Sequence, residues 1–395
     1  MTMPEAGLPR GDWSYPTAIR FGAGRLSELP DACREAGMAR PLLVSDPGLV
    51  EAGLVARAEH AITAGDMTTG LFTDIRGNPT GTNVEAGIRA FHDGGHDGLV
   101  GLGGGSAIDV AKTIALMSGQ TRPVWDFEDR EDWWRRADAS AIRPLIAIPT
   151  TAGTGSEVGR AAVISDDTTG HKKLIFHPLL LPRVAILDPE LTVGLPPALT
   201  AATGMDALVH NLEAYVARGH HPIAEGIALE GLRLIAENLE RACQDGADLQ
   251  ARGAMLVGSA MGAIAFQKGL GGVHALAHPI GSLFDTHHGL TNAVLLPYVL
   301  AFNMPVTGDK LARLARFLDL DDHTPQAVMR WTLNLRRAVG IPHNLEALGV
   351  SEGGITRLVP LAANDQAAAG NPRSLSNQDI ATLYSDAIAG RLANT

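Results

Sequence analysis

The stretch Leu99-Val-Gly-Leu-Gly-Gly-Gly-Ser-Ala-Ile-Asp-Val-Ala-Lys112 decides the fold of the first half of the chain. It runs from an apolar segment through Gly103, Gly104 and Gly105 into an alanine-rich segment, which predicts a buried strand, a tight turn and a helix. Glycines let the backbone approach a ligand, and the free N–H groups at a helix start favour an anion such as a pyrophosphate. Ser106 would cap the helix or donate to phosphate. A purely structural turn is the alternative, because the spacing matches neither G-x-G-x-x-G nor a Walker A loop.

Around this stretch the first half alternates apolar runs with longer amphipathic segments. The apolar runs are typical of buried parallel strands joined by crossover helices, and they lie at residues 41–45, 99–102, 145–149 and 184–187. After residue 191 helical periodicity takes over, at residues 198–216, 223–238, 248–266, 273–283, 309–318, 324–338 and 377–392. The sequence therefore predicts an α/β domain at residues 1–190 and an all-helical domain at 191–395, with a small-molecule cleft between them.

Composition narrows the class of protein. The chain has 395 residues, enough for two or three domains, and its formal net charge of −11 shows no basic patch for nucleic acid or anionic lipid. The N-terminus lacks the pattern of a signal peptide, and no apolar stretch approaches the roughly 20 residues that span a bilayer. The only two cysteines, Cys33 and Cys243, predict neither a disulfide framework nor a thiolate metal site. We expect a soluble cytoplasmic protein with no nucleic-acid or membrane partner.

Polar groups follow two of the predicted strands. The turn Ile148-Pro-Thr-Thr-Ala-Gly-Thr-Gly-Ser-Glu157 offers the hydroxyls of Thr150, Thr151, Thr154 and Ser156 where a strand would end. They suit a polar ligand along the carboxyl edge of a sheet, or they belong to an ordinary polar loop. Asp46 comes directly after another strand, where a carboxylate accepts hydrogen bonds from a ribose 2′-OH and repels a 2′-phosphate. A helix or turn cap is the alternative for Asp46.

Histidines and one aspartate form a pattern in the second half. Asp206 and His210 are four residues apart, so a helix would place both on one face. His274 and His278 repeat this spacing, and His288 follows. Three imidazoles and one carboxylate can hold one divalent ion, which polarises an alcohol or carbonyl oxygen. Each histidine taken alone is more often a core residue, but two such pairs favour a metal site.

In this order the motifs resemble the iron-containing, group III alcohol dehydrogenase family over nearly the whole chain. They are Trp13-Ser-Tyr-Pro16 with Phe21-Gly-Ala-Gly24, Gly103-Gly-Gly-Ser106 with Asp109 and Lys112, Pro149 to Glu157, Asp188-Pro-Glu-Leu191, Gly204-Met-Asp-Ala207 with His210, His274-Ala-Leu-Ala-His278, and His288-Gly-x-x-Asn292-Ala. The resemblance implies a Rossmann-like dinucleotide-binding domain, a helical metal-binding domain in a dehydroquinate synthase-like architecture, and a homodimer or larger assembly. It also implies two cofactors in the cleft, NAD rather than NADP and one divalent metal, Fe²⁺ or Zn²⁺.

The same resemblance implies the site residues. The metal ligands would be Asp206, His210, His274 and His288, with His287 as a weaker competitor for the last position. His278 would lie near the metal and the nicotinamide without being a ligand. The cofactor would be bound by Asp46, which favours NAD, by Gly103, Gly104, Gly105 and Ser106 at the pyrophosphate, by Thr150, Thr151, Thr154 and Ser156, and by Lys172, with Lys173 as the fallback.

The resemblance also implies the reaction. The enzyme would act on a small alcohol or aldehyde and pass a hydride between its carbinol carbon and nicotinamide C4, in either direction. His278 would relay the proton. Two residues depart from the family pattern at the cleft, Arg160 and Lys268, and both would bind an anionic substrate tail such as that of a semialdehyde or hydroxy acid. Solvent-facing or interdomain cations are the alternative reading of these two residues.

Four other functions stay open. A maleylacetate-reductase-like enzyme is the nearest, but its relatives generally lack the full metal set that this chain has. A hydroxyacid-oxoacid transhydrogenase would keep its NAD bound. A dehydroquinate-synthase-like lyase shares the architecture but needs several cationic phosphate-binding residues that we do not identify. A non-catalytic NAD or metal sensor would show no turnover of NADH.

Overall fold

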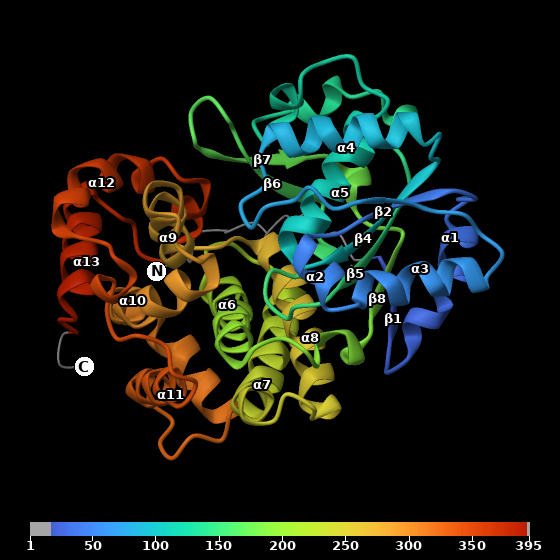
Figure 1. The fold of residues 1–395 in the computed structure, drawn as a ribbon. Helices are drawn as coiled ribbons and strands as arrows, with labels where there is room; N and C mark the ends of the chain where they lie inside the picture. Colours follow the sequence, from blue (N-terminus) through green and yellow to red (C-terminus); the bar gives the residue numbers. More distant parts are fainter. Residues whose placement is uncertain (1–16, 393–395) are drawn as a thin grey trace, which may run out of the picture.

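A computed structural model describes residues 17–392, so the motif Trp13 to Pro16 lies outside the described residues. Within this range six strands form one parallel sheet, in the order β1-β8-β5-β4-β2-β3 (Figure 1). They are β1 (Ala18–Phe21), β2 (Pro41–Val44), β3 (Gly70–Phe72), β4 (Gly98–Gly103), β5 (Leu145–Pro149) and β8 (Val184–Leu187). The predicted α/β fold with a parallel sheet is confirmed.

Helices cover both faces of this sheet. They are α1 (Leu29–Glu35), α2 (Pro47–Glu51), α3 (Leu54–Ala64), α4 (Gly81–Asp93) and α5 (Gly105–Met117). Side chains of β2 alternate between two cores: Leu42 packs with α4 and α5, whereas Leu43 packs with α1 and α3. Figure 1 shows these two pairs of helices on opposite faces of the sheet. Because both faces are covered, the strands are almost continuously apolar.

The four strands expected from apolar runs are all present, but the sequence analysis missed four others. Two of these, β1 and β3, are short edge strands with partly exposed side chains. The other two form an antiparallel hairpin, β6 (Ala161–Ser165) and β7 (Lys172–Phe176), outside the main sheet. β3 has only three residues and Arg20 interrupts β1, so neither carries a long apolar run; β6 does carry one, Ala161-Ala-Val-Ile164, which the sequence analysis overlooked.

The second part of the described chain is helical, as predicted. Its helices are α6 (Pro197–Val216), α7 (Pro222–Gln244), α8 (Leu249–Ala265), α9 (Gly272–Phe284), α10 (His288–Phe317), α11 (Pro325–Ala338), α12 (Ile355–Ala363) and α13 (Asn377–Ala389). The sequence analysis recognised only the end of α10 and missed α12. Both contain internal prolines, Pro297 and Pro305 in α10 and Pro360 in α12, which disfavour a helix, whereas α9 was recognised despite Pro279. One large apolar cluster joins these helices.

One expectation about apolar stretches is corrected. Two described helices, Leu249–Lys268 and α10, are long and apolar enough to cross a membrane by length and composition alone. Both are mostly buried among the other helices, and core helices commonly pass this test. The boundary near residue 190 stays a prediction; β8 ends at Leu187 and α6 begins at Pro197.

Candidate active site

The strand order places two candidate residues at the carboxyl edge of the sheet. The chain runs from β2 outward to β3 and then returns to β4 on the other side of β2, so connections leave β2 and β4 in opposite directions. Such a switch point is the usual ligand crevice of a doubly wound sheet. Asp46 follows β2, and Gly103 ends β4. A Cβ placed on Gly103 would lie 3.4 Å from Oδ2 of Asp46, so the two residues share this crevice.

The glycine turn is shaped for close approach. Gly103 has a φ of +149°, and an added Cβ would lie 2.8 Å from the Cβ of Ala107. A Cβ on Gly105 would lie 2.7 Å from Oγ1 of Thr154, and one on Gly104 would lie 3.5 Å from Oγ1 of Thr151. The turn therefore has no room for side chains at Gly103 and Gly105, and it leads into the N-terminus of a 13-residue helix. These features fit a pyrophosphate.

Two hydroxyls differ from their predicted uses. Gly104, not Ser106, is the N-cap of α5, and Oγ of Ser106 donates to the carbonyl of Gly77 at 2.7 Å. The hydroxyl of Ser156 is buried and donates to Oδ1 of Asp109 at 2.6 Å. Ser156 thus joins its loop to α5 and is not an open donor of the crevice.

A buried charge network surrounds Ser156. Nζ of Lys112, which is fully buried, donates to Oγ of Ser156 at 2.9 Å and to the carbonyl of Ala161 at 2.9 Å. Burial lowers the pKa of Lys112 to about 8 and raises the pKa of Glu157 to about 7. Oδ2 of Asp109 accepts from the N–H of Val163 at 2.9 Å. The network fastens the loop at residues 150–156 and strand β6 to helix α5.

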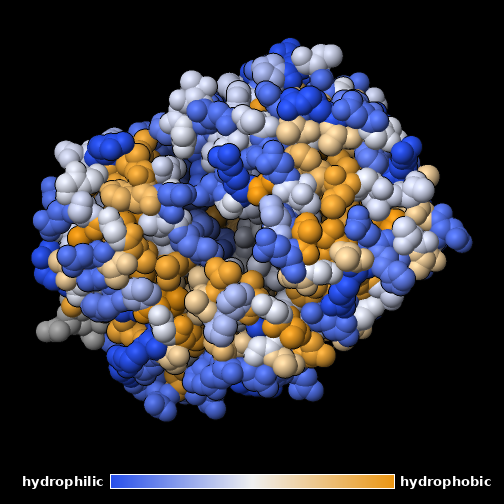
Figure 2. Space-filling view, in the orientation of Figure 1, coloured by the Kyte–Doolittle hydropathy of each residue, from blue (hydrophilic) through white to orange (hydrophobic). Residues whose placement is uncertain are grey.

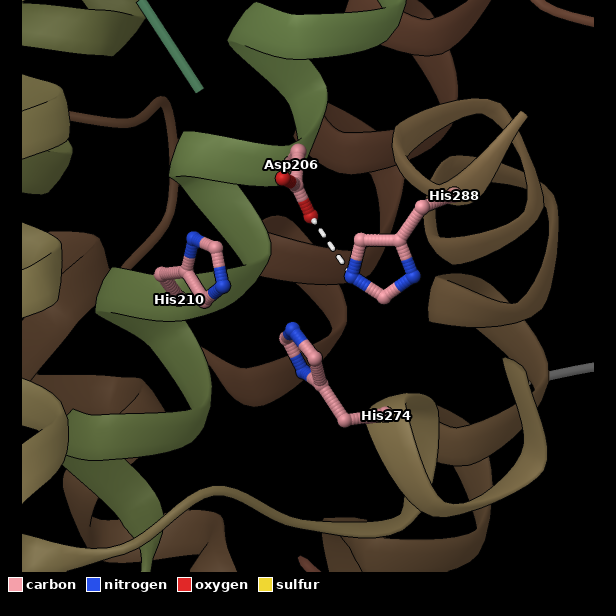
Figure 3. Close-up of side chains that lie close together, drawn as sticks. All are labelled: Asp206, His210, His274 and His288. Atoms are coloured by element: carbon pink, nitrogen blue, oxygen red, sulfur yellow. Dashed lines mark ion pairs between the residues drawn. The ribbon is translucent and has the colours of Figure 1, made fainter. Parts of the chain in front are cut away.

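The four predicted metal ligands come together from three helices (Figure 3). Asp206 and His210 lie one turn apart on α6, His274 is in the first turn of α9, and His288 begins α10. One ligand atom of each lies within 4.8 Å of those of the other three. Gly289 allows this convergence, since an added Cβ would lie 2.5 Å from the carbonyl oxygen of Ala202 on α6.

Outer hydrogen bonds orient the imidazoles. Nδ1 of His210 donates to the carbonyl of Gly153 at 3.2 Å, and Nδ1 of His274 donates to Oε2 of Glu213 at 2.7 Å. Their Nε2 atoms then carry the lone pairs that can bind a metal, which is the arrangement found around protein-bound metals. Burial lowers the pKa of His274 and of His288 well below 6.5, which favours the neutral, ligating form. A donor set of three nitrogens and one carboxylate oxygen fits one divalent ion.

Asn292 lies against the cluster of candidate metal ligands. Nδ2 of Asn292 donates to Oδ1 of Asp206 at 2.7 Å and lies 3.1 Å from Nε2 of His288. Oδ1 of the same amide is buried without a hydrogen-bond partner among the described residues. Nδ2 also lies 3.3 Å from Nε2 of His274, so this one atom contacts three of the four candidate ligands, which shows how closely those ligands converge.

His278 and His287 border the cluster without joining it. The ring of His278 stacks on the ring of His288, with a centroid distance of 5.4 Å, and its Nδ1 donates to Oδ2 of Asp365 at 2.8 Å. His287 is exposed and caps α10, its Nδ1 accepting from the N–H of Leu290 at 3.3 Å. The geometry therefore favours His288 over His287 in the ligand set.

The hairpin brings Lys172 to the same place. Its Nζ would lie 3.5 Å from a Cβ added to Gly281 on α9, and its positive charge contributes to lowering the pKa of His288. Burial lowers the pKa of Lys172 itself. The fallback residue, Lys173, pairs with Asp166 at 2.7 Å and lies over the ring of Trp125. Of these two lysines, Lys172 is the one that lies near His288.

The two predicted substrate cations differ in their surroundings. Nζ of Lys268 is buried, pairs with Oε1 of Glu225 at 2.8 Å and donates to the carbonyl of Tyr215 at 2.9 Å. With 1% of its side chain exposed, Lys268 stabilises the junction of α6, α7 and α8, and its assignment to substrate is withdrawn. Arg160 is partly exposed beside the ring of Phe176, and its charge opposes the rise that burial causes in the pKa of Asp129.

Three residues of the site received no role in the sequence analysis, although one of them, Asn292, stands in a motif quoted there. Glu213 is three residues after His210 and Asn292 is four after His288, so each shares a helix face with a predicted ligand. This spacing could have indicated that Glu213 and Asn292 lie beside the metal ligands. Asp365 is 87 residues from His278 and has no local signal. Figure 2 shows the surface hollowed between the sheet part and the helical part.

Comparison with known proteins identifies the group to which this chain belongs. A family model described as iron-containing alcohol dehydrogenase matches residues 16–189, and one for the C-terminal part of the same family matches residues 200–388. The chain is 42% identical over 377 residues to 4-hydroxybutyrate dehydrogenase from Cupriavidus necator, covering 92% of this chain and 96% of the relative.

Two crystal structures are similar over nearly their whole length. A 1,3-propanediol oxidoreductase superposes with a TM-score of 0.91 at 35% identity, covering 95% of this chain and 99% of the other. The sulfoacetaldehyde reductase of Bifidobacterium kashiwanohense in complex with NAD⁺ gives 0.87 at 30% identity, covering 97% and 99%. Because family models match both parts of the chain, and a 42% identical relative is covered over nearly its whole length, the chain belongs to the iron-containing alcohol dehydrogenase family, the oxidoreductases that act on CH–OH groups.

Proposed function

We propose that this protein is an NAD-dependent, divalent-metal-dependent alcohol dehydrogenase that also reduces the corresponding aldehydes. The loop at residues 150–156 carries the proposal because it touches both candidate sites. The N–H of Thr150 donates to the carbonyl of Gly103 in the glycine turn at 3.0 Å, and the carbonyl of Gly153 accepts from Nδ1 of His210 at 3.2 Å. A dinucleotide on the turn and an ion on the histidines would therefore be neighbours.

The residues have distinct roles in this proposal. Gly103, Gly104 and Gly105 bind the pyrophosphate through backbone N–H groups, and Asp46 accepts from the ribose and disfavours a 2′-phosphate. Asp206, His210, His274 and His288 would hold the ion, which when bound supplies a Lewis acid for the oxygen of the substrate. NAD supplies the hydride acceptor. His278 moves the proton between the substrate oxygen and solvent.

We propose ω-hydroxy acids and their semialdehydes as the substrate class. The 42% identical relative and the sulfoacetaldehyde reductase both have names that describe an anionic substrate. In this chain Arg160 directly precedes strand β6. Its guanidinium lies beside the ring of Phe176 on strand β7, which also carries Lys172. A guanidinium binds a carboxylate through two parallel hydrogen bonds, which would fix the far end of such a substrate.

A matched pair of substrates tests this proposal. Purified protein is reconstituted anaerobically with Fe²⁺ or with Zn²⁺, and NADH oxidation is followed with succinic semialdehyde and with butanal, which have the same chain length. We expect turnover of both, with the lower KM for the semialdehyde. Arg160→Gln should raise the KM for the semialdehyde about tenfold, as expected for loss of about 1.4 kcal/mol, and leave that for butanal unchanged.

Three results would contradict the proposal in different ways. No NADH oxidation with any aldehyde would refute the dehydrogenase activity. Equal turnover after removal of the metal would refute metal dependence. The exposed Arg122→Gln serves as the control for a lost arginine, and an equal effect of both substitutions would refute the role of Arg160.

The assembly and compartment are part of the same proposal. We propose a homodimer or larger, acting in the cytoplasm. Light scattering of the purified protein tests the first part, because a mass near the 41.4 kDa of one chain would contradict it. Cell fractionation tests the second part.

A further inference from the structure

The contact between His278 and Asp365 determines which nitrogen of the imidazole faces the cleft. Nδ1 of His278 lies 2.8 Å from Oδ2 of Asp365. An ionised carboxylate only accepts hydrogen bonds, so Nδ1 carries the proton. In the neutral ring Nε2 then has the lone pair and acts as an acceptor. Among the described residues Nε2 of His278 has no hydrogen-bond partner, and 34% of the side chain is exposed.

Asp365 itself is held in place. It is the N-cap of the 3₁₀ turn Gln366–Gly370, and its second carboxylate oxygen, Oδ1, accepts from the N–H of Ala367 at 2.9 Å. On the sheet side, Nε2 of Gln366 donates to the carbonyl of Asp129 at 2.7 Å. The carboxylate therefore sits on a segment fixed across the cleft.

The other end of this turn is tied to the helix that carries the histidines. Asn371 is fully buried, and its Oδ1 accepts from the N–H of Gly272 at the start of α9 at 3.0 Å. It also accepts from Nδ2 of Asn303 on α10 at 2.8 Å. Asp365 and His278 are thus positioned by the same junction, although 87 residues separate them in the chain.

The ring of His278 lies beside the ligand cluster. It stacks on His288 with an interplanar angle of 14° and meets the ring of His274 edge-on at 5.8 Å. It is not part of the set of four converging ligand atoms. A base next to a bound substrate oxygen, rather than a fifth ligand, is the role this placement permits.

We propose that Asp365 is a positioning residue that holds His278 in the Nδ1–H form, with Nε2 directed at the substrate hydroxyl. This inference rests on the proposed function. In oxidation the O–H proton would move to Nε2 of His278 while the C–H bond breaks and the C=O bond forms; bound NAD⁺ would supply the acceptor, nicotinamide C4, for the hydrogen and its electron pair. In reduction each transfer runs in reverse. Asp365 touches neither substrate nor cofactor in this scheme.

A double-mutant cycle tests the proposal on the metal-loaded, full-length protein. Asp365→Asn keeps the size and the cap, but its amide can donate to Nδ1 as readily as accept from it. We expect kcat to fall about 10- to 100-fold with little change in KM, metal content or melting temperature. In a His278→Ala background the same substitution should have no further effect on kcat. Asp365→Glu, which keeps the carboxylate, should have a kcat between that of Asp365→Asn and that of the unsubstituted protein.

Asp138→Asn is the matched control. Asp138 also caps a 3₁₀ turn, Ala139–Ala141, with Oδ1 accepting from the N–H of Ser140 at 2.9 Å. It should leave kcat unchanged. A kcat for Asp365→Asn equal to that of Asp138→Asn would overturn the proposal, as would an equal loss with and without His278.

A readout independent of turnover separates this inference from the proposed function. In the zinc-loaded protein labelled with ¹⁵N-histidine, the signal that disappears in His278→Ala should show a protonated Nδ1. A protonated Nε2 with a bare Nδ1 would overturn the inference even in an active enzyme. If no aldehyde is reduced, the proposed function fails, and this spectrum still decides whether Asp365 sets the form of His278.

Discussion

Glu213 accepts a hydrogen bond of 2.7 Å from Nδ1 of His274, and both side chains are buried. The same carboxylate accepts from the N–H groups of Gly271, at 3.0 Å, and Val273, at 2.7 Å, at the start of α9. One residue of α6 therefore fixes both the position of α9 and the orientation of its ligating imidazole. Burial raises the pKa of Glu213 to about 7 despite these hydrogen bonds.

Glu213→Gln should weaken metal binding about 10- to 100-fold, because the amide holds the imidazole less firmly and lowers its basicity. The dissociation constant is measured by competition with a chelator of known affinity. Glu230→Gln on the surface of α7 should leave it unchanged. Equal affinities for all three proteins would show that Glu213 serves only the fold.

His288 and its neighbour His287 provide a direct test of the ligand set. His288→Ala should abolish stoichiometric metal binding and NADH-linked turnover, because it removes one of four converging ligands. His287→Ala should keep both and lose only about 1 kcal/mol of stability, the usual contribution of a helix cap. Elemental analysis and thermal unfolding measure these outcomes. Metal retained by His288→Ala and lost by His287→Ala would reverse the assignment.

Asp46→Asn should shift the cofactor preference from NADH toward NADPH. The substitution removes the charge that repels a 2′-phosphate, while asparagine keeps the acceptor for the N–H of Leu49, 3.1 Å from Oδ1 of Asp46. We expect the ratio of kcat/KM for NADH to that for NADPH to fall about tenfold, which corresponds to about 1.4 kcal/mol. An unchanged ratio would show that Asp46 acts only as the cap of α2.

Glu157 predicts a pH dependence of stability. Burial raises its pKa from an ordinary 4.5 to about 7, so between these values the folded protein holds a proton that the unfolded chain releases. Stability therefore falls as the pH rises from 4.5 to 7, by about 3 kcal/mol for this group. Glu157→Gln should flatten that part of the profile, measured by urea unfolding at several pH values. The control Glu240→Gln, at an exposed residue, should leave the profile unchanged. A profile flattened by Glu240→Gln and unchanged in Glu157→Gln would contradict the prediction.

Much of this protein could be predicted from local patterns in the chain. The apolar runs and the glycine turn predict the central strands and the start of α5, because a buried parallel strand and a helix N-terminus each leave a signature within about ten residues. The spacing of Asp206 with His210 places two candidate ligands on one helix face for the same reason. The short edge strands lack such a signature, and the internal prolines of α10 interrupt its helical pattern.

The sequence by itself therefore determined the fold class, the family and the placement of Asp206 and His210 on one helix face. Only the tertiary structure decided which histidines converge, that Lys268 is neutralised by Glu225 instead of facing the cleft, and that Asp365 meets His278. The physical reason is the range of the interactions. Periodicity records contacts within a helix or strand, whereas a ligand set and its supporting carboxylates are assembled by the packing of α6, α9 and α10 and by a turn far along the chain.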